Sequence, residues 1–192
     1  KQREILTRAS GKMGGLSDMV SELLDLSRIE SGLITSEKEQ LDIENMLHEQ
    51  VDFHTPGAAE QDSTISLQIE AGLPLVFANK RGMEEVLTNL ITNAIKYSPK
   101  GSSIAVESWI ENGYLSTAVK DKGYGIPAED LERIFDRFYR VKDENTRTQQ
   151  GTGLGLSLVK SIVETHHGKV KVNSTIGEGT TFTFLLPINE ID

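Results

Sequence analysis

One stretch decides the fold of this chain: EVLTNLITNAIKYS, from Glu85 to Ser98. Read at about 3.6 residues per turn, it predicts a helix with two working faces. One face is an apolar stripe made of Val86, Leu87, Leu90, Ile91, Ala94 and Ile95. The other face is polar and carries Glu85, Asn89, Asn93, Lys96 and Tyr97. Asparagine is a mediocre helix former because its amide competes for backbone hydrogen bonds. We therefore expect the two asparagines, one helical turn apart, to face a ligand.

The overall composition restricts the class of protein. A chain of 192 residues with 37% hydrophobic content can bury one core and has some length left over, so we expect one domain with an arm. Its formal net charge of −9 disfavours nucleic acid as a partner. The absence of cysteine excludes disulfides and thiolate metal sites, and is compatible with a reducing compartment.

Membrane and targeting signals are also absent from the sequence. Nothing resembles a signal peptide, and no apolar run approaches the roughly 20 residues that a spanning helix needs. We expect these residues to be cytoplasmic and to make no membrane contact, while a longer parent protein can still be anchored in the inner membrane.

The arm is expected at the N-terminus. From Lys1 to about Gly32 there is no proline, and apolar residues recur at intervals of three and four, which predicts a long helix with a broad apolar face. Such a helix needs a partner to cover its stripe, from its own domain or from a second chain. A helix lying on the main domain is an equally consistent interpretation of the pattern.

The flanking segments predict a mixed set of strands and helices. Asn112-Gly113 between two alternating runs predicts a β-hairpin. Alternation and turn residues predict further strands at Thr64–Glu70, Leu75–Ala78, Lys169–Asn173 and from Thr180 to Leu186, a short strand and helix from Leu41 to Val51, a short helix at Ala128–Ile134, and a helix at Leu154–His166.

Two glycine-rich segments are candidate ligand contacts. Asp121-Lys122-Gly123-Tyr124-Gly125-Ile126-Pro127 follows a strand, where closely spaced glycines let the backbone approach a ligand, although the segment taken alone can be only a turn. Gly151-Thr152-Gly153-Leu154-Gly155-Leu156 opens a helix, whose first N–H groups can bind phosphate oxygens. Its glycine spacing matches neither the dinucleotide fingerprint nor the Walker pattern. Residues 141–150, just before it, have the composition of a mobile loop.

Taken together, these segments resemble the ATP-binding domain of bacterial sensor histidine kinases, in the superfamily that also holds gyrase B, MutL and the large heat-shock chaperone. The N box NLITNAIKYS, the first glycine box DKGYGIP, the aromatic box FDRFYR, the second glycine box GTGLGLSLVK and the terminal GEGTTFTFLLP occur in the family's order. Each segment alone is a modest signal, whereas the ordered set is very specific.

The resemblance extends to the arm. MVSELLDLSRIESG looks like the exit of the second helix of the dimerisation and phosphotransfer hairpin into the catalytic domain. The phosphoacceptor motif, a histidine followed by an acidic residue and Leu-Arg-Thr-Pro, is missing. We expect the four histidines, His48, His54, His166 and His167, to be surface or helix-end residues. The chain is therefore expected to be a fragment that starts after the phosphorylated histidine.

The resemblance implies a role for each residue of the polar helix face. Asn93 would bind Mg²⁺ through its amide oxygen, and Asn89 would position the phosphates, at a position where ATP-hydrolysing relatives carry a water-activating glutamate. Lys96 would contact phosphate and Tyr97 would flank the nucleotide. Glu85 would be an assisting base or, more simply, a solvated carboxylate.

Outside that helix, Asp121 would accept a hydrogen bond from the adenine amino group, supported by Thr180. Arg140 would stabilise charge on the transferring γ-phosphoryl group or remain a plain surface residue. Phe135 and Phe138 would dock the loop that closes over the phosphates or fill core. The remaining expected nucleotide contacts are Gly123, Gly125, Ile126, Gly151, Thr152, Gly153, Leu154, Gly155 and Leu156.

We therefore expect a two-layer α/β sandwich over residues 37–192 and a protruding N-terminal helix over residues 1–36. By resemblance, it would bind Mg-ATP and transfer the γ-phosphoryl group to a histidine outside this chain, for relay to a response-regulator aspartate, and its parent would be a homodimer. A nucleotide-hydrolysing or serine-phosphorylating cousin, or a non-catalytic module that ATP switches, are the alternatives.

Overall fold

The computed structural model describes Leu24, residues 37–141 and residues 151–188. In chain order the elements are β1 (Glu39–Leu41), α2 (Ile43–Ala59), β2 (Thr64–Ile69), β3 (Val76–Ala78), α3 (Lys80–Lys96), β4 (Ser103–Glu111), β5 (Tyr114–Lys120), the 3₁₀ helix η1 (Ala128–Asp130), α4 (Gly155–Thr165), β6 (Lys169–Thr175) and β7 (Gly179–Pro187).

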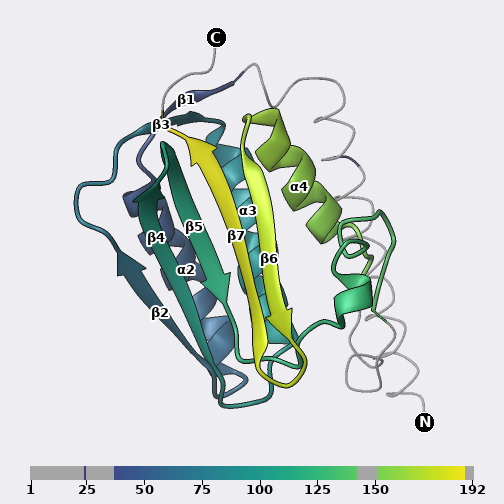
Figure 1. Cartoon of the computed structure of the whole chain (residues 1–192). Helices are drawn as coiled ribbons and strands as arrows, with labels where there is room; N and C mark the ends of the chain where they lie inside the picture. The colour runs from purple at the N-terminus through teal and green to yellow at the C-terminus, as the bar shows by residue number, and fades with distance from the viewer. Residues whose placement is uncertain (1–23, 25–36, 142–150, 189–192) are drawn as a thin grey trace.

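The main sheet has five strands in the order β2-β4-β5-β7-β6. Its first pair, β2 with β4, is parallel, and the other neighbours are antiparallel. Helices α2, α3 and α4 lie together on one face of this sheet (Figure 1). A separate two-stranded sheet joins β1 to β3. The two-layer α/β sandwich with a mixed sheet is thus confirmed.

Helix α3 lies in the middle of the helical layer, between α2 and α4 (Figure 1). All six residues of its predicted apolar stripe are buried, because they face the sheet and the neighbouring helices. The polar face is only half-buried. The helix begins at Lys80 rather than Glu85, since the Asn79 side chain caps it by accepting a 2.7 Å hydrogen bond from the Gly82 N–H.

The predicted helix at Ala128–Ile134 is wrong in extent. Only Ala128–Asp130 is helical, as a 3₁₀ turn. A series of turns follows, one of which is closed by a 2.8 Å hydrogen bond from the Asp136 N–H to the Arg133 carbonyl. A segment this short gains few backbone hydrogen bonds against the cost of nucleating a helix, and the side chain of Pro127 provides no N-terminal cap.

The histidine prediction was wrong for His54. This residue lies in the interior of α2 and is buried, as is His166, which does stand at a helix end. The imidazole Nε2 of His166 accepts a 2.9 Å hydrogen bond from the Asn79 N–H, so it joins the end of α4 to the start of α3. His48 and His167 are exposed, as expected.

Two expectations fall outside the described residues: the N-terminal helix, of which only Leu24 is described, and the loop at residues 142–150. Within the described part of the chain, no helix combines the length and apolar character needed to cross a bilayer.

Candidate functional site

The polar face of α3 forms one wall of the site. The Nδ2 group of Asn89 donates to the Glu85 carbonyl at 2.9 Å and to the Glu85 carboxylate at 3.0 Å. These two bonds turn the Asn89 amide oxygen toward Gly155, the first residue of α4, where an added Cβ would collide with that oxygen. Glycine at position 155 therefore lets α4 begin directly against the asparagine.

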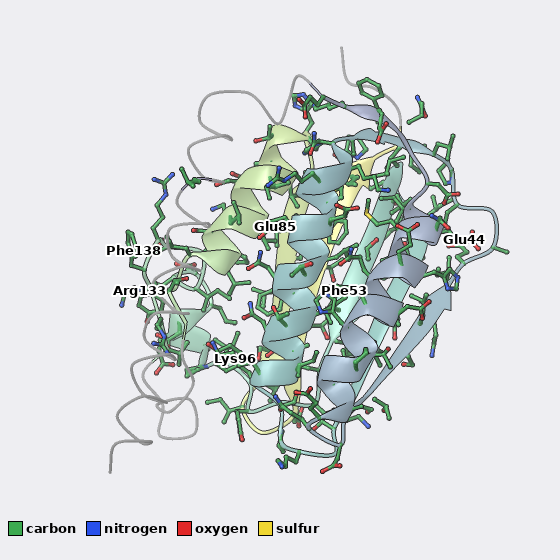
Figure 2. The ribbon with its side chains drawn as sticks, turned by 180° about the vertical axis from the view of Figure 1, so that it is seen from behind. Glu44, Phe53, Glu85, Lys96, Arg133 and Phe138 are labelled. Atoms are coloured by element: carbon green, nitrogen blue, oxygen red, sulfur yellow. The ribbon has the colours of Figure 1, made fainter. Side chains whose placement is uncertain are left out.

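Further along the same face lie Asn93 and Lys96. The Asn93 side chain is half-buried and makes no hydrogen bond within residues 37–141 and 151–188. Lys96 lies close to the second glycine box, since a Cβ added at Gly151 would stand 2.8 Å from its Nζ and 3.9 Å from the Tyr97 hydroxyl. Glu85 and Lys96 both project from α3, at well-separated levels (Figure 2). The cation and the amides thus follow one line along the helix, facing residues 151–155.

Residues 151–155 form the second wall. Gly153 has φ +76°, a conformation that side chains disfavour, and its carbonyl accepts a 2.9 Å hydrogen bond from the Phe138 N–H. Thr152 bends the chain by accepting a 3.2 Å bond from the Leu154 N–H. Leu154 is buried and supplies no side-chain cap to α4. The start of α4, which lies against Asn89, therefore has no side-chain cap among the described residues, an arrangement suited to anions.

The aromatic box supports this wall from behind. The Phe135 ring packs edge-on against Phe182 of the core at 6.4 Å, whereas the Phe138 side chain is 58% exposed. Phe138 has φ +64° and meets the glycine box through its backbone. The Tyr139 hydroxyl donates to Asp130. Arg140 is exposed, and Phe138 projects away from the main body (Figure 2).

A buried carboxylate lies at the end of the sheet. Asp121 is 7% exposed, and its Oδ1 atom accepts hydrogen bonds from the Gly123 N–H at 2.8 Å and the Thr180 N–H at 3.1 Å. Burial raises the pKa of this carboxyl, and those two bonds act in the opposite direction. No hydrogen bond reaches Oδ2 from the residues that the structure describes, so this oxygen remains available to a ligand.

The first glycine box follows Asp121 and needs both of its glycines. A Cβ on Gly123 would collide with the Tyr97 carbonyl and stand 2.6 Å from Asp121 Oδ1. Gly125 has φ +74°, and a Cβ there would collide with the Thr175 carbonyl. The Tyr97 carbonyl also accepts a 3.1 Å bond from the Tyr124 N–H. The box is therefore held between the end of α3 and the turn after β6, and it is more than a simple turn.

Ser174 is a residue that our sequence analysis missed. Its Oγ accepts a 2.8 Å hydrogen bond from the N–H of Ile126, whose half-buried side chain packs on the core. The predicted strand ended at Asn173, whereas β6 runs on to Thr175. A signal was present, because Ser174 continues the inward alternation of Val170 and Val172 and is a polar residue at a core-facing position.

The structure thus brings most expected site residues into two neighbouring groups. The polar face of α3 meets residues 151–155, and Asp121, Gly123, Gly125 and Thr180 meet at the end of the sheet. Tyr97 connects the groups, because its hydroxyl lies toward Gly151 and its carbonyl toward Gly123. Three expected residues lie apart from these contacts: Ile126 and Leu156 are half-buried and pack against the core, and Arg140 is exposed.

Comparison with known proteins shows to which family this chain belongs. The model of the histidine kinase-, DNA gyrase B- and HSP90-like ATPases matches residues 78–190. The sensor-like histidine kinase SenX3 of Mycolicibacterium smegmatis is 34% identical over 172 residues, covering 90% of this chain and 44% of that protein. The sensor histidine kinase WalK of Bacillus subtilis is 47% identical over 108 residues, covering 55% of this chain and 18% of WalK.

Solved structures agree with these sequence relatives. The crystal structure of full-length ShkA in complex with AMPPNP has a TM-score of 0.81 at 25% identity, covering 97% of this chain and 38% of ShkA. The mycobacterial sensor histidine kinase MprB has a TM-score of 0.67 at 26% identity, covering 78% of this chain and 97% of that structure. The chain thus spans less than half the length of SenX3 and of ShkA. The matched residues include the N box, both glycine boxes and the aromatic box, and the chain belongs to the histidine kinase-, DNA gyrase B- and HSP90-like ATPase family.

Proposed function

We propose that this chain binds Mg-ATP and transfers the γ-phosphoryl group to a histidine, from which a response-regulator aspartate receives it. The observation that carries the proposal is the junction of α3 with residues 151–155, where an amide, a lysine and uncapped helix N–H groups converge. Family membership and the nucleotide analogue bound to ShkA support it.

The adenine would lie at the end of the sheet. Asp121 Oδ1 is already occupied by two N–H groups, so Oδ2 would accept from the exocyclic amino group. Guanine presents a carbonyl at that position, which a carboxylate repels. The Thr180 hydroxyl would support this contact, and the tight packing at Gly123 and Gly125 would keep the base flat against the chain.

The residues of α3 fit a magnesium ion. Mg²⁺ is a hard cation that takes oxygen ligands, keeps several waters and is bound by few protein groups plus substrate phosphates. Asn93 offers a half-buried amide oxygen with no partner among the described residues, and would hold the ion together with the phosphates. Bound there, Mg²⁺ would supply charge neutralisation on the phosphates.

The phosphate contacts would come from both walls. Lys96 would contact phosphate oxygens, and residues 151–155 with the start of α4 would donate backbone N–H groups. Arg140 would reach the γ-phosphoryl group and stabilise its charge. In the transfer itself, an imidazole nitrogen of the acceptor would bond to the γ-phosphorus while the bond to the bridging oxygen breaks, and ADP would leave.

Asn89 favours transfer over hydrolysis. An amide cannot take a proton from water, and this amide donates both of its bonds back to Glu85. Residue 89 itself therefore supplies no base to activate water, whereas an imidazole acceptor is itself a competent nucleophile.

The same proposal assigns roles to the N-terminal residues and to the parent protein. Residues 1–36 would be the second helix of a dimerisation and phosphotransfer hairpin, attached to a catalytic domain over residues 37–192. The parent would be a homodimer with its kinase part in the cytoplasm and a possible anchor in the inner membrane. Because the printed sequence lacks the phosphoacceptor motif, the acceptor histidine would lie on another segment.

Calorimetric titration with Mg-ATP tests nucleotide binding. We expect saturable binding by the unaltered chain, and a loss of about tenfold or more in affinity in Asn93→Ala and Asp121→Asn. Asn45→Ala and Asp52→Asn, changes of the same residue types on the exposed face of α2, are the matched controls and should bind normally. Titrations without saturation by the unaltered chain would refute the proposal.

A second assay separates transfer from the alternatives. With radiolabelled ATP, we expect acid-labile phosphohistidine only when a histidine-bearing first helix from the parent protein is added as a separate polypeptide. Phosphate release without that helix would indicate a hydrolase, and binding without transfer in its presence would indicate a switch module. Label on His48 or His54 of the chain alone would contradict our expectation that it does not phosphorylate itself.

A further inference from the structure

Three residues form a row across the end of the sheet. Ser174 of β6 lies directly opposite Thr180 of β7. Asp121 continues the register of β5, in which Lys120 pairs with Thr181, and its N–H donates to the Thr180 carbonyl at 2.9 Å. Residues directly opposite one another share a face of the sheet. Asp121, Thr180 and Ser174 therefore lie side by side on the face that the helices cover.

The hydroxyl of Ser174 has three hydrogen-bond partners, which match its full hydrogen-bonding capacity. It donates its proton to the Gly179 carbonyl at 3.0 Å. It accepts from the Ile126 N–H at 2.8 Å, and it lies 2.9 Å from the Thr180 hydroxyl oxygen. A serine hydroxyl has one proton and two lone pairs. With the Ser174 proton directed to Gly179, we assign Thr180 as the donor of the bond between the two hydroxyls.

This direction of the hydrogen bond determines which role the Thr180 hydroxyl can take toward a further group. Its only hydroxyl proton points to Ser174, so the lone pairs of Oγ1 remain for other groups. No other hydrogen bond of this hydroxyl occurs among the described residues. Thr180 is 6% exposed, so water does not compete freely for its orientation. Away from Ser174, the Thr180 hydroxyl is therefore an acceptor, beside the Asp121 carboxylate.

We propose that Ser174 is a positioning residue for base selection: by accepting the hydrogen bond from the Thr180 hydroxyl, it leaves Thr180 and Asp121 as a pair of acceptors facing the nucleotide base. The inference rests on the proposed function, and it assigns a role to a residue that would not touch the nucleotide. A base with an exocyclic amine, which carries two protons, suits such a pair, directly or through a water molecule. A base with a carbonyl at the same position would face two acceptors, and a carbonyl oxygen cannot donate a hydrogen bond to either.

The perturbation to make is Ser174→Ala. Without Ser174, the Thr180 hydroxyl is free to rotate and donate toward the base, so a guanine carbonyl is better tolerated. We expect the ratio of GTP to ATP dissociation constants to fall about five- to tenfold, the effect of one neutral hydrogen bond. Ser174→Cys keeps the size but offers a weak donor and acceptor, and should lower the ratio in the same direction. Ser174→Thr keeps the hydroxyl and should preserve the ratio.

A double-mutant cycle shows whether Ser174 acts through Thr180. In a Thr180→Val background there is no hydroxyl to orient, so adding Ser174→Ala should leave the ratio unchanged. Thr175→Ala, at the exposed neighbouring hydroxyl of the same strand, is the matched control and should resemble the unaltered chain.

The outcomes are distinct. If Ser174→Ala weakens ATP and GTP equally, or if it still changes the ratio in the Thr180→Val background, Ser174 is merely structural and the inference is wrong. If the unaltered chain binds no ATP, the proposed function itself fails. Thermal unfolding of each variant, followed by circular dichroism, confirms that the titrations compare folded proteins.

Discussion

Replacing Gly123 by alanine would test the packing between the first glycine box and the end of α3. The new Cβ would collide with the Tyr97 carbonyl and stand 2.6 Å from Asp121 Oδ1. Backbone cannot move aside cheaply, so overpacking should cost about 1–3 kcal/mol. Displacing the Gly123 to Asp121 hydrogen bond adds about 1 kcal/mol. We therefore expect a loss of about 2–4 kcal/mol in the free energy of unfolding.

The measurement is urea unfolding without nucleotide, together with thermal unfolding, in which the midpoint should fall by on the order of 10 °C. Affinity for ATP should fall as well, because the displaced carboxylate is the expected adenine contact. Gly57→Ala is the matched control: it lies within α2 with nothing within 4 Å of the added Cβ, and should stabilise by about 0.5–1 kcal/mol. Equal stability and equal ATP affinity of Gly123→Ala and the unaltered chain would refute the packing argument.

Two further changes test other contacts. Glu85→Met removes the carboxylate, one of the two acceptors that orient the Asn89 amide, and we expect calorimetry to show a several-fold loss of Mg-ATP affinity. Glu85→Gln keeps an acceptor at this position and should bind normally. Glu84→Met, at a partly exposed residue outside this contact, is the control, and equal losses in all three variants would contradict the idea. Burial lowers the pKa of His166, so the unfolded chain takes up the proton first as the pH falls below about 6.5. Stability should be retained above that pH and decline in acid by at most about 1.4 kcal/mol per pH unit from this residue. Urea unfolding across pH 5 to 8 should show a flatter profile in His166→Gln, and an unchanged profile would exclude this role.

Much of the fold could be predicted because its signals are local. The stripe of α3 follows from helical periodicity, and the Asn112-Gly113 turn adopts positive φ at both residues, as that dipeptide favours in hairpins. The ordered boxes then predicted the candidate site, since each box is a short segment with its own residue pattern.

Other features depend on contacts between distant segments. The early start of α3 requires Asn79, whose N–H is accepted by His166, 87 residues later in the chain. The parallel pairing of β2 with β4 and the burial of His54 likewise arise only when separate elements pack together. Ser174 was missed for the same reason, because its partners Ile126 and Thr180 belong to two different segments.

The hydrogen bond from the Phe138 N–H to the Gly153 carbonyl also has a consequence for sequence change. It joins Phe138 to Gly153 and so closes the segment between them into a loop. The entropic cost of closing a ring grows only logarithmically with its length, by about 0.6 kcal/mol per doubling. Insertions between residues 141 and 151 should therefore leave the fold intact, so this segment can grow in length while both of its ends stay in place.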